Sequence, residues 1–334
     1  MPCLVTGGAG FLGAHVARAL LDAGHDVVVL DDLSGGFVDN VDPRARLVTG
    51  SIVDHEAVDA LFAAERFDHV FHLAAYAAEG LSPFIKRFNY TNNVIGSVNL
   101  INASINFDVR CFVFTSSIAV YGSGQVPMTE DLLPQPEDSY GIAKYAVEQE
   151  LRASHEFFGL DYVIFRPHNV YGELQNIGDR YRNVLGIFMN QIMRDEPLTI
   201  FGDGTQTRAF SYVGDVAPAI ATAPWTDGAP GEIFNVGADT PYSVNELADV
   251  VRRAMGVSDH PVRHLAARNE VLHAFSDHSK LHRVFGVSAE VDLREGVRRM
   301  ADWAREHGAR ETSLFAGIEI ERGLPEGWAQ LREG

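Results

Sequence analysis

The feature that most constrains the fold is a glycine-rich loop at the start of the chain. Thr6-Gly7-Gly8-Ala9-Gly10-Phe11-Leu12-Gly13 follows an apolar, strand-like run and opens a helical pattern. Gly7 permits a tight turn, Gly10 lets the backbone approach a pyrophosphate, and Gly13 allows helix and sheet to pack closely. The helix N-terminus then offers its N–H groups to the anion. In this strand–turn–helix context, the loop predicts a dinucleotide site.

A carboxylate stands at the end of the second predicted strand, where a dinucleotide fold needs one. Asp31 follows Gly13 by 18 residues. A carboxylate there accepts hydrogen bonds from ribose hydroxyls and repels a 2′-phosphate, which favours NAD over NADP. Asp31 could also be an ordinary strand-end turn residue, and Asp32 fits that interpretation better. Ser34 and Gly35, with the next glycine, either wrap the adenosine or form only a loop.

Short β-branched runs alternate with amphipathic segments through the first half of the chain. Strands are expected at 3–6, 26–30, 46–48, 69–73, 111–115 and 162–165, and helices near 11–24, 55–65, 84–107 and 139–158. Apolar strands separated by helices indicate a parallel sheet covered on both faces. We therefore predict an α/β protein with a Rossmann doubly wound sheet over residues 1–166.

The regular alternation ends after Arg166, and residues 167–334 are expected to form mainly a smaller, mixed α/β substrate-binding lobe. Some later segments return to the first domain. A helix near 181–195, strands at 210–213 and 233–236, and a helix at 243–255 are expected. The chain after residue 310 is expected to be peripheral.

Composition narrows the possible partners and the compartment. The formal net charge of -18 argues against nucleic acid or an anionic membrane. An anionic ligand would need its own cluster of arginines. Cys3 and Cys111 lie in apolar runs, as expected of buried thiols in a reducing cytosol. No signal peptide is expected, and the apolar runs are too short to span a bilayer, so a cytoplasmic protein is predicted.

Tyr140 and Lys144 stand four residues apart on a predicted helix, where side chains share one face. An ammonium near the phenol would stabilise its ionised form and give a base usable near neutral pH. Beside a nicotinamide, such a base could oxidise an alcohol. Alone, the pair is equally well a helix surface pair; the glycine loop upstream favours the catalytic interpretation.

Two strand ends supply further candidates. His72 precedes Leu73 and the small residues Ala74 and Ala75, which would let the backbone lie close to a cofactor. His72 itself is better interpreted as a buried, hydrogen-bonded residue than as a catalyst. The next strand ends in Thr115-Ser116-Ser117, at the edge that holds ligands in open α/β sheets. One of these three hydroxyls is expected to bond a substrate alcohol or keto oxygen.

Taken together, these motifs resemble the extended short-chain dehydrogenase/reductase family. The resemblance rests on the glycine loop, His72–Ala75, Ser116-Ser117-Ile-Ala-Val-Tyr-Gly122, Tyr140–Lys144 and Arg166-Pro-His-Asn-Val-Tyr-Gly172, and extends to about residue 300. Within that family, the chain is most similar to the nucleotide-sugar 4-epimerases of the UDP-glucose 4-epimerase type. The family implies NAD as cofactor, a nucleotide-diphosphate sugar as substrate, and a homodimer formed through helices near 84–107 and 140–157.

The resemblance also implies residue roles. Ser117 would position the sugar 4-hydroxyl, Tyr140 would be the base, and Lys144 would hold the nicotinamide ribose and lower the pKa of Tyr140. Further implied cofactor contacts are Phe11, Leu12, Asp31, Ser51, Ile52, Asn92 and His168. Implied sugar-nucleotide contacts are Asn169, Asn183, Phe201, Arg208 and Arg268, of which the two arginines would clamp the diphosphate or else lie at the solvated surface. No metal ligand set is expected.

Oxidation at sugar carbon 4 is the shared first step that the resemblance implies. Related dehydratases, decarboxylases and 3,5-epimerases place Asp-Glu, Glu or Cys beside the strand-end hydroxyl, whereas this chain has Ile118 and Ala119. The simplest remaining chemistry is 4-epimerisation, with NAD regenerated in each cycle. The alternatives are a 4-ketoreductase, an epimerase acting at another carbon, and a non-catalytic NAD-binding regulator.

Several positions depart from the family pattern. Gly50-Ser51-Ile52 replaces a usual Gly-Asp, so a charge near the adenine is lost. Ala77 stands where a lysine is typical, and Arg268-Asn-Glu-Val replaces Arg-Pro-Gly-Asp. Glu79 would lie beside the sugar, where it could meet a hydroxyl, repel a uronate, or only be a solvated loop residue. These departures leave the sugar open.

Overall fold

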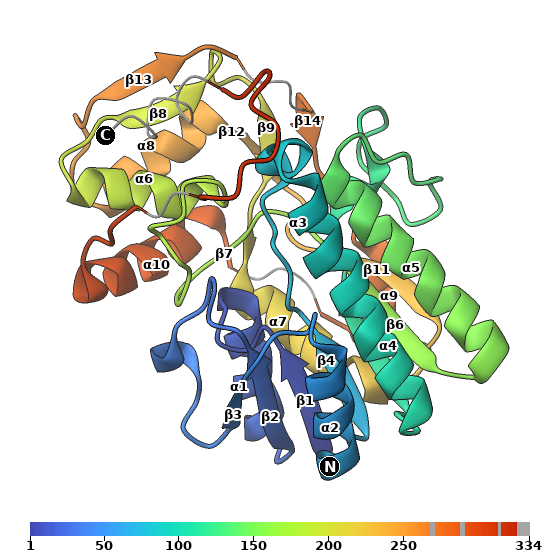
Figure 1. The fold of residues 1–334 in the computed structure, drawn as a ribbon. Helices are drawn as coiled ribbons and strands as arrows, with labels where there is room; N and C mark the ends of the chain where they lie inside the picture. The colour runs from blue at the N-terminus through green and yellow to red at the C-terminus, as the bar shows by residue number, and fades with distance from the viewer. Residues whose placement is uncertain (268–270, 288–290, 313–314, 326–334) are drawn as a thin grey trace.

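A seven-stranded parallel sheet forms the centre of the molecule, as a computed structural model describing residues 1–267, 271–287, 291–312 and 315–325 shows (Figure 1). Its strand order is β11-β6-β5-β4-β1-β2-β3. The strands are β1 (Pro2–Thr6), β2 (Asp26–Asp31), β3 (Arg46–Thr49), β4 (His69–His72), β5 (Cys111–Thr115), β6 (Asp161–Pro167) and β11 (Glu232–Val236). All six strands expected in the first half are present, and the predicted Rossmann-type fold is confirmed.

Alternation along the strands explains the three layers. In β1, Cys3 and Val5 point into one apolar cluster and Leu4 points into the other. One face is covered by α1 (Phe11–Asp22) and α7 (Val213–Thr222), and the other by α2 (His55–Glu65), α4 (Gly96–Asn106) and α5 (Ser139–Phe158). Both faces of a parallel sheet are thus buried, as its continuous apolar strands require.

The helix expected over 84–107 is divided into shorter pieces. A 3₁₀ segment, η2 (Glu79–Phe84), precedes α3 (Lys86–Tyr90), and a wide π turn (Thr91–Ile95) leads into α4. The break falls at Ile85, whose φ of -136° is not helical, and the chain is helical from Lys86 onward with the π turn inside it.

The second half builds small sheets and helices beside the carboxyl ends of the main strands (Figure 1). Its elements are β7 (Val170–Tyr171), α6 (Val184–Met193), β8 (Leu198–Phe201), β9 (Thr207–Ala209), β10 (Ser211–Tyr212), η5 (Ala223–Trp225), β12 (Pro241–Ser243), α8 (Val244–Ala254), β13 (Val262–Leu265), β14 (His273–Ala274), α9 (Ser279–Phe285) and α10 (Leu293–His307). The first half contains two further 3₁₀ turns, η1 (Val38–Asn40) and η4 (Ile118–Tyr121). β11 returns to the main sheet beside β6.

Two expectations for this half are corrected. The strand expected at 210–213 spans only Ser211–Tyr212, because Val213 opens α7, a helix that the sequence pattern did not predict. Its apolar residues pack against α1 in the main core. The helix expected from residue 181 begins at Val184, since the Asn183 side chain accepts from the backbone N–H of Leu185 and caps it.

Two further observations bear on the compositional expectations. Over the described residues, no helix combines the length and apolar character needed to cross a bilayer. Cys3 and Cys111 are buried and unpaired, and burial raises the pKa of each thiol to about 12. Thiols that stay protonated in this way are poor nucleophiles.

Candidate active site

A large cleft, with a volume of about 1440 Å³, lies at the carboxyl ends of the main strands. Most of the predicted cofactor residues line it. These are Gly7, Gly10, Phe11, Leu12, Gly13, Asp31, Asp32, Ser34, Gly35, Ile52, Leu73, Ala74, Ala75, Asn92, Tyr140, Lys144 and His168. Ser51 is not among the lining residues, and its hydroxyl accepts a hydrogen bond from the N–H of Val53 instead. The structure therefore does not bring Ser51 to the site.

The glycine loop is packed so closely that no side chain fits in it. Gly7 has a φ of +71°, and a Cβ there would lie 2.7 Å from the backbone nitrogen of Ala74. A Cβ on Gly13 would lie only 2.2 Å from the carbonyl oxygen of Gly7. The first turn of α1 therefore lies directly against the loop, with its N-terminus in the cleft. This cradle fits a dinucleotide pyrophosphate.

Asp31 anchors the loop at the end of β2. Its carboxylate accepts hydrogen bonds from the N–H groups of Ala9 at 3.0 Å and Leu33 at 2.8 Å. Burial raises the pKa of Asp31, and these backbone hydrogen bonds oppose that rise. Asp32 caps the following turn through the N–H of Ser34. Asp31 thus fixes the geometry of the cofactor end as well as lining it.

Tyr140 lies in the first turn of α5 and lines the cleft. Asp138 caps this helix through the N–H groups of Tyr140 and Gly141. Burial raises the pKa of Tyr140, and the charge of Glu79 raises it further, while a hydrogen bond with Ser117 lowers it. Ser117 and Tyr140 are therefore brought together as expected, but the protein groups alone do not depress the pKa of the phenol.

Lys144 is buried one turn further along α5. Its Nζ donates to the carbonyl oxygen of Thr115 at 2.7 Å and lies 5.8 Å from the centroid of the Tyr140 ring. Desolvation lowers the pKa of Lys144 from 10.5 to about 7, although Glu148 acts in the opposite direction. The ammonium is thus close to the phenol but held by the strand end of β5.

A buried ion pair beneath Lys144 was not predicted from the sequence. Arg166 donates through Nε to Glu148 at 2.9 Å, and its Nη1 donates to the hydroxyl of Tyr121 at 2.7 Å. Ser116 donates to the same carboxylate at 2.5 Å. The network joins the residue that follows β5 to η4, β6 and α5, one helical turn along α5 from Lys144. The i+4 spacing of Glu148 from Lys144 was the available signal.

His72 has a structural role, as expected. Its Nδ1 lies 2.8 Å from the Thr6 hydroxyl and its Nε2 lies 2.8 Å from the Ser97 hydroxyl. Complete burial keeps its pKa well below the usual value. Both ring nitrogens are therefore occupied, and the preferred interpretation of His72 is confirmed.

His168 lines the cleft and belongs to a buried histidine pair. Its Nδ1 faces the carbonyl oxygen of Ala209 at 3.0 Å, so that nitrogen carries hydrogen. Its Nε2 lies 3.1 Å from Nε2 of His278, whose Nδ1 lies 2.6 Å from Asp239. Burial lowers the pKa of His168 to about 3.

Of the predicted sugar-nucleotide contacts, Asn169, Asn183, Phe201 and Arg208 line the cleft. Asn183 donates to the carbonyl oxygen of Val170 at 2.6 Å while it caps α6. The guanidinium of Arg208 donates to the backbone carbonyl oxygens of Thr207 at 2.8 Å and Leu272 at 3.1 Å. Arg268 lies outside the described residues. Arg208 therefore fixes a neighbouring loop from its position in the cleft.

A local cluster of arginines lines the cleft despite the acidic chain. Its members are Arg180, Arg182, Arg208 and Arg263. Sequence reasoning identified only Arg208 among these. Arg182 pairs with Asp179 at 3.0 Å, and its guanidinium carbon lies 5.1 Å from the centroid of the Tyr76 ring. The site thus has the positive charge that an anionic ligand needs.

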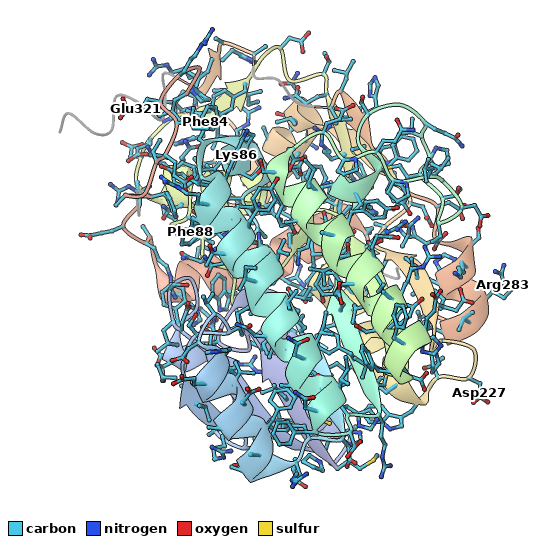
Figure 2. The ribbon with its side chains drawn as sticks, turned by 45° about the vertical axis from the view of Figure 1, so that its right-hand side comes forward. Phe84, Lys86, Phe88, Asp227, Arg283 and Glu321 are labelled. Atoms are coloured by element: carbon cyan, nitrogen blue, oxygen red, sulfur yellow. The ribbon has the colours of Figure 1, made fainter. Side chains whose placement is uncertain are left out.

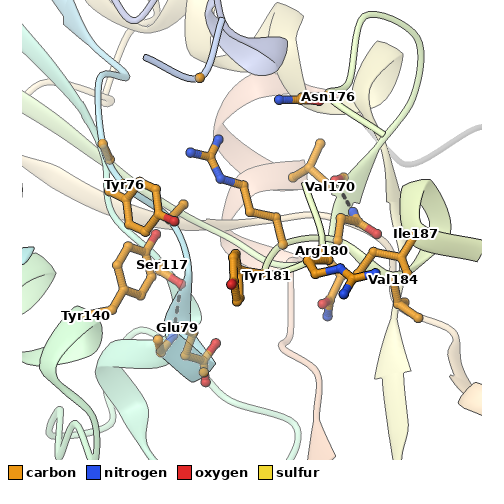
Figure 3. A pocket seen from close by; sticks show the side chains of 18 of the residues that line it. Tyr76, Glu79, Ser117, Tyr140, Val170, Asn176, Arg180, Tyr181, Val184 and Ile187 are labelled. Carbon is orange, nitrogen blue, oxygen red and sulfur yellow. Dashed lines mark hydrogen bonds between the residues drawn. The ribbon is translucent and has the colours of Figure 1, made fainter. Parts of the chain in front are cut away.

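Aromatic and acidic side chains lie around Tyr140 in the cleft. Figure 3 shows Tyr76, Ser117, Tyr140 and Glu79 on one side of the pocket and Arg180 on the other, with Tyr181 between them. Tyr76 was not predicted, because nothing in its local sequence marks it as a binding residue. This end of the cleft is suited to a polar ligand that carries an alcohol.

The described residues after residue 310 are not peripheral, contrary to expectation. Thr312, Gly323 and Pro325 line the cleft. Local sequence could not reveal this, because the contacts join this segment to residues more than 200 positions earlier.

Comparisons with known proteins agree with this geometry. The sequence model of the NAD dependent epimerase/dehydratase family matches residues 3–237. A UDP-glucose 4-epimerase of Mycolicibacterium smegmatis is 34% identical over 311 residues, covering 91% of this chain and 99% of that protein.

Solved structures give the same picture. UDP-glucose 4-epimerase of Thermotoga maritima with UDP-glucose has a TM-score of 0.88 and 35% identity, covering 92% of this chain and 99% of that one. UDP-glucuronic acid 4-epimerase of Bacillus cereus, in complex with UDP-glucuronic acid and NAD, has a TM-score of 0.84 and 29% identity, covering 92% of this chain and 100% of that one.

Proposed function

The chain belongs to the NAD dependent epimerase/dehydratase family, and on this basis we propose that it interconverts two UDP-hexoses that differ in configuration at sugar carbon 4. NAD is the cofactor of the family, and the packed glycine loop with Asp31 fits it. The relatives act on UDP-glucose and on UDP-glucuronic acid, so the class of substrate is a UDP-sugar.

One observation carries the choice of reaction. Ser117 and Tyr140 both line the cleft, and the residues that follow Ser117 there are Ile118 and Ala119. Neither has an acidic, basic or thiol group that could eliminate water, remove a carboxylate or deprotonate a neighbouring carbon. Proton transfer at one alcohol is the chemistry that this part of the site supports.

In the proposed reaction, Ser117 orients the sugar 4-hydroxyl and Tyr140 accepts its proton. The glycine loop and Asp31 would hold NAD, which would supply the reversible hydride acceptor for carbon 4 and a positive charge that favours the ionised phenol. Lys144 would hold the cofactor ribose and keep positive charge near Tyr140. Tyr140 then gives the proton back, so neither protons nor electrons are consumed overall.

The cleft arginines suggest a second candidate substrate, a UDP-hexuronate. Arg180 and Arg182 supply positive charge that a sugar carboxylate could use, in addition to the diphosphate. Glu79 opposes this, because its carboxylate lies on the same side as Tyr140 (Figure 3). We therefore place a neutral hexose first.

The test is turnover by purified protein without added cofactor. UDP-galactose should be converted to UDP-glucose, followed by NMR, and no deuterium should enter the sugar in deuterated water. A requirement for stoichiometric NADH would instead identify a 4-ketoreductase, and solvent label beside the ketone would identify another carbon. A higher kcat/KM for UDP-glucuronate than for UDP-glucose would select the uronate.

We also propose that two copies pair through α4, α5 and the preceding π turn, which lie side by side in Figure 2. Ile95, Ile142 and Phe157 are exposed large apolar side chains on these elements. Burying them would reduce apolar contact with water. Light scattering should report twice the monomer mass, and Ile95→Asp combined with Ile142→Asp should shift it toward the monomer.

A further inference from the structure

Part of the segment that follows α10 lines the cleft, and we call its described residues, 308–312 and 315–325, the strap. Its first part is fixed to α6 by a reciprocal pair of hydrogen bonds. The backbone N–H of Arg310 donates to Oδ1 of Asn190 at 2.9 Å, and Nδ2 of Asn190 donates to the Arg310 carbonyl at 3.1 Å. The Arg310 guanidinium carbon also lies 3.8 Å from the centroid of the Phe37 ring, in the cofactor half. The strap therefore starts with contacts to both halves.

The strap next packs against the loop that carries the cleft arginines. A Cβ on Gly178 would lie 2.5 Å from the carbonyl oxygen of Glu311 and 3.1 Å from Cβ of Arg310. Backbone therefore approaches backbone at this point, which only glycine allows. Arg180 and Arg182 follow within four residues and line the cleft.

The far part of the strap is fixed to η2 and α3. The N–H groups of Glu319 and Ile320 donate to the carbonyl oxygen of Phe84 at 2.8 and 3.1 Å. The Glu319 carboxylate accepts from the N–H groups of Arg87 at 3.0 Å and Phe88 at 2.9 Å. These N–H groups belong to the first turn of α3, where the helix itself provides no acceptor. Figure 2 shows Glu321 in the same region as Phe84 and Lys86.

Between these anchors, Phe315 supports a wall of the cleft. Its ring centroid lies 5.2 Å from that of Tyr76 and 4.9 Å from that of Phe88. Tyr76 and Phe88 meet edge to face at 5.2 Å. Tyr76 lines the cleft and carries Arg182 over its ring. The strap therefore packs against the Tyr76 side chain, which lines the part of the cleft where the sugar is proposed to bind.

We propose that the strap is part of the substrate site, and that Phe315 and Glu319 are positioning residues that hold Tyr76 and η2 in place for the nucleotide sugar. The proposed function supplies only the name of the ligand. When the wall is ordered before the ligand binds, binding does not carry the entropic cost of ordering the wall. Loss of this order therefore weakens binding. Tyr140 is fixed separately, by the Asp138 cap of α5, so the chemical step keeps its geometry.

The experiment compares Phe315→Ala and Glu319→Gln in the full-length, NAD-containing protein. Each should raise KM for UDP-glucose about 10-fold while kcat stays within about 2-fold and the NAD content is unchanged. Leu133→Ala and Glu306→Gln are matched controls at exposed positions away from the cleft and should leave KM unchanged. Unchanged KM in both strap variants, or a fall in kcat alone, would overturn the proposal.

Hydrogen exchange separates this proposal from the proposed function. UDP alone should slow exchange of the Glu319 and Ile320 amides in the wild type, because a ligand in the cleft stabilises the hydrogen bonds that these amides make to Phe84. If UDP-glucose is not converted but UDP slows this exchange, the reaction is wrong and the strap stands. If UDP-glucose is converted and the exchange does not change, the strap proposal fails alone.

Discussion

The two ends of the cleft are built in different ways. At the cofactor end, backbone lies against backbone, because Gly7 and Gly13 leave no room for a Cβ. The Asp31 carboxylate accepts a hydrogen bond from the glycine loop at Ala9. At the sugar end, side chains from distant segments meet, among them Tyr76, Arg182 and Phe315. The cofactor end depends on local sequence, and the sugar end depends on long-range packing.

This difference indicates where the chain can vary. A loop without free space accepts one ligand geometry, so its sequence is nearly determined by the dinucleotide. A wall made of side chains can change size and charge by single substitutions while the sheet behind it stays the same. Substrate choice should therefore depend on the sugar end, and loss of the cofactor end should remove all activity.

The largest effect is expected at the cofactor end, for Gly13→Ala. The added Cβ would lie 2.2 Å from the Gly7 carbonyl oxygen, so the loop must move and the pyrophosphate cradle is lost. The purified variant should contain no NAD, by absorbance of the denatured extract, and no epimerase activity. Asp22→Ala, at the exposed C-terminal end of the same helix and outside the cleft lining, is the control. Normal NAD content in Gly13→Ala would contradict the comparison.

The next largest effect is expected where the two ends meet, for Tyr140→Phe. Removal of the phenolic oxygen should reduce kcat by about 10²–10⁴-fold, the usual contribution of a general acid or base. Bound NAD should remain, since the ring and the helix are unchanged. Tyr145→Phe, one turn further along α5, is the control and should retain activity. Full turnover by Tyr140→Phe would remove this tyrosine from the mechanism.

Burial of Lys144 predicts a dependence of stability on pH. Its pKa is lowered from 10.5 to about 7 by desolvation, so between about pH 7 and 10 the unfolded chain binds more protons than the native protein. Stability attributable to this residue therefore rises with pH across that window, by at most about 1.4 kcal/mol per pH unit, and is flat below it.

This dependence can be measured by urea unfolding of cofactor-stripped wild type and Lys144→Met between pH 6 and 9. The difference in unfolding free energy should grow in favour of the wild type above about pH 7. Lys280→Met, which removes a lysine paired with Glu232 near the surface, should show no such growth. A constant difference for Lys144→Met would mean that its ammonium is not desolvated.

The smallest effect is expected at the sugar end, for Arg182→Met. The apolar stem is kept, whereas the charge over Tyr76 and beside Asp179 is lost. KM for UDP-glucose should rise about 10-fold, equivalent to about 1.4 kcal/mol, with the NAD content unchanged. Arg283→Met, on α9 away from the cleft, is the control (Figure 2). Loss of NAD from Arg182→Met would show that the two ends are not independent.

The limits of sequence reasoning follow the same division. The glycine loop, Asp31 and the Tyr140–Lys144 spacing were predictable, because each depends on positions close together in the chain. The helix α7 was missed because Gly214 and Pro218 are typical of turns, whereas packing against α1 stabilises a helix there. Arg182 and Phe315 carry no local signal, since only tertiary contacts place them in or behind the wall. Ser51 was predicted to contact the cofactor, but its hydroxyl accepts a hydrogen bond from the nearby N–H of Val53 instead.

The contact between Glu319 and the start of α3 has a consequence for the nascent chain during synthesis. Its partners are 232 and 231 positions apart. At about 5–20 residues per second, a ribosome needs roughly 10 s or more to add that length. The dinucleotide loop is synthesised first, and the strap, which supports the wall at the sugar end, is synthesised much later. A truncated translation product that stops before residue 308 would therefore lack this wall although its cofactor segments had been synthesised.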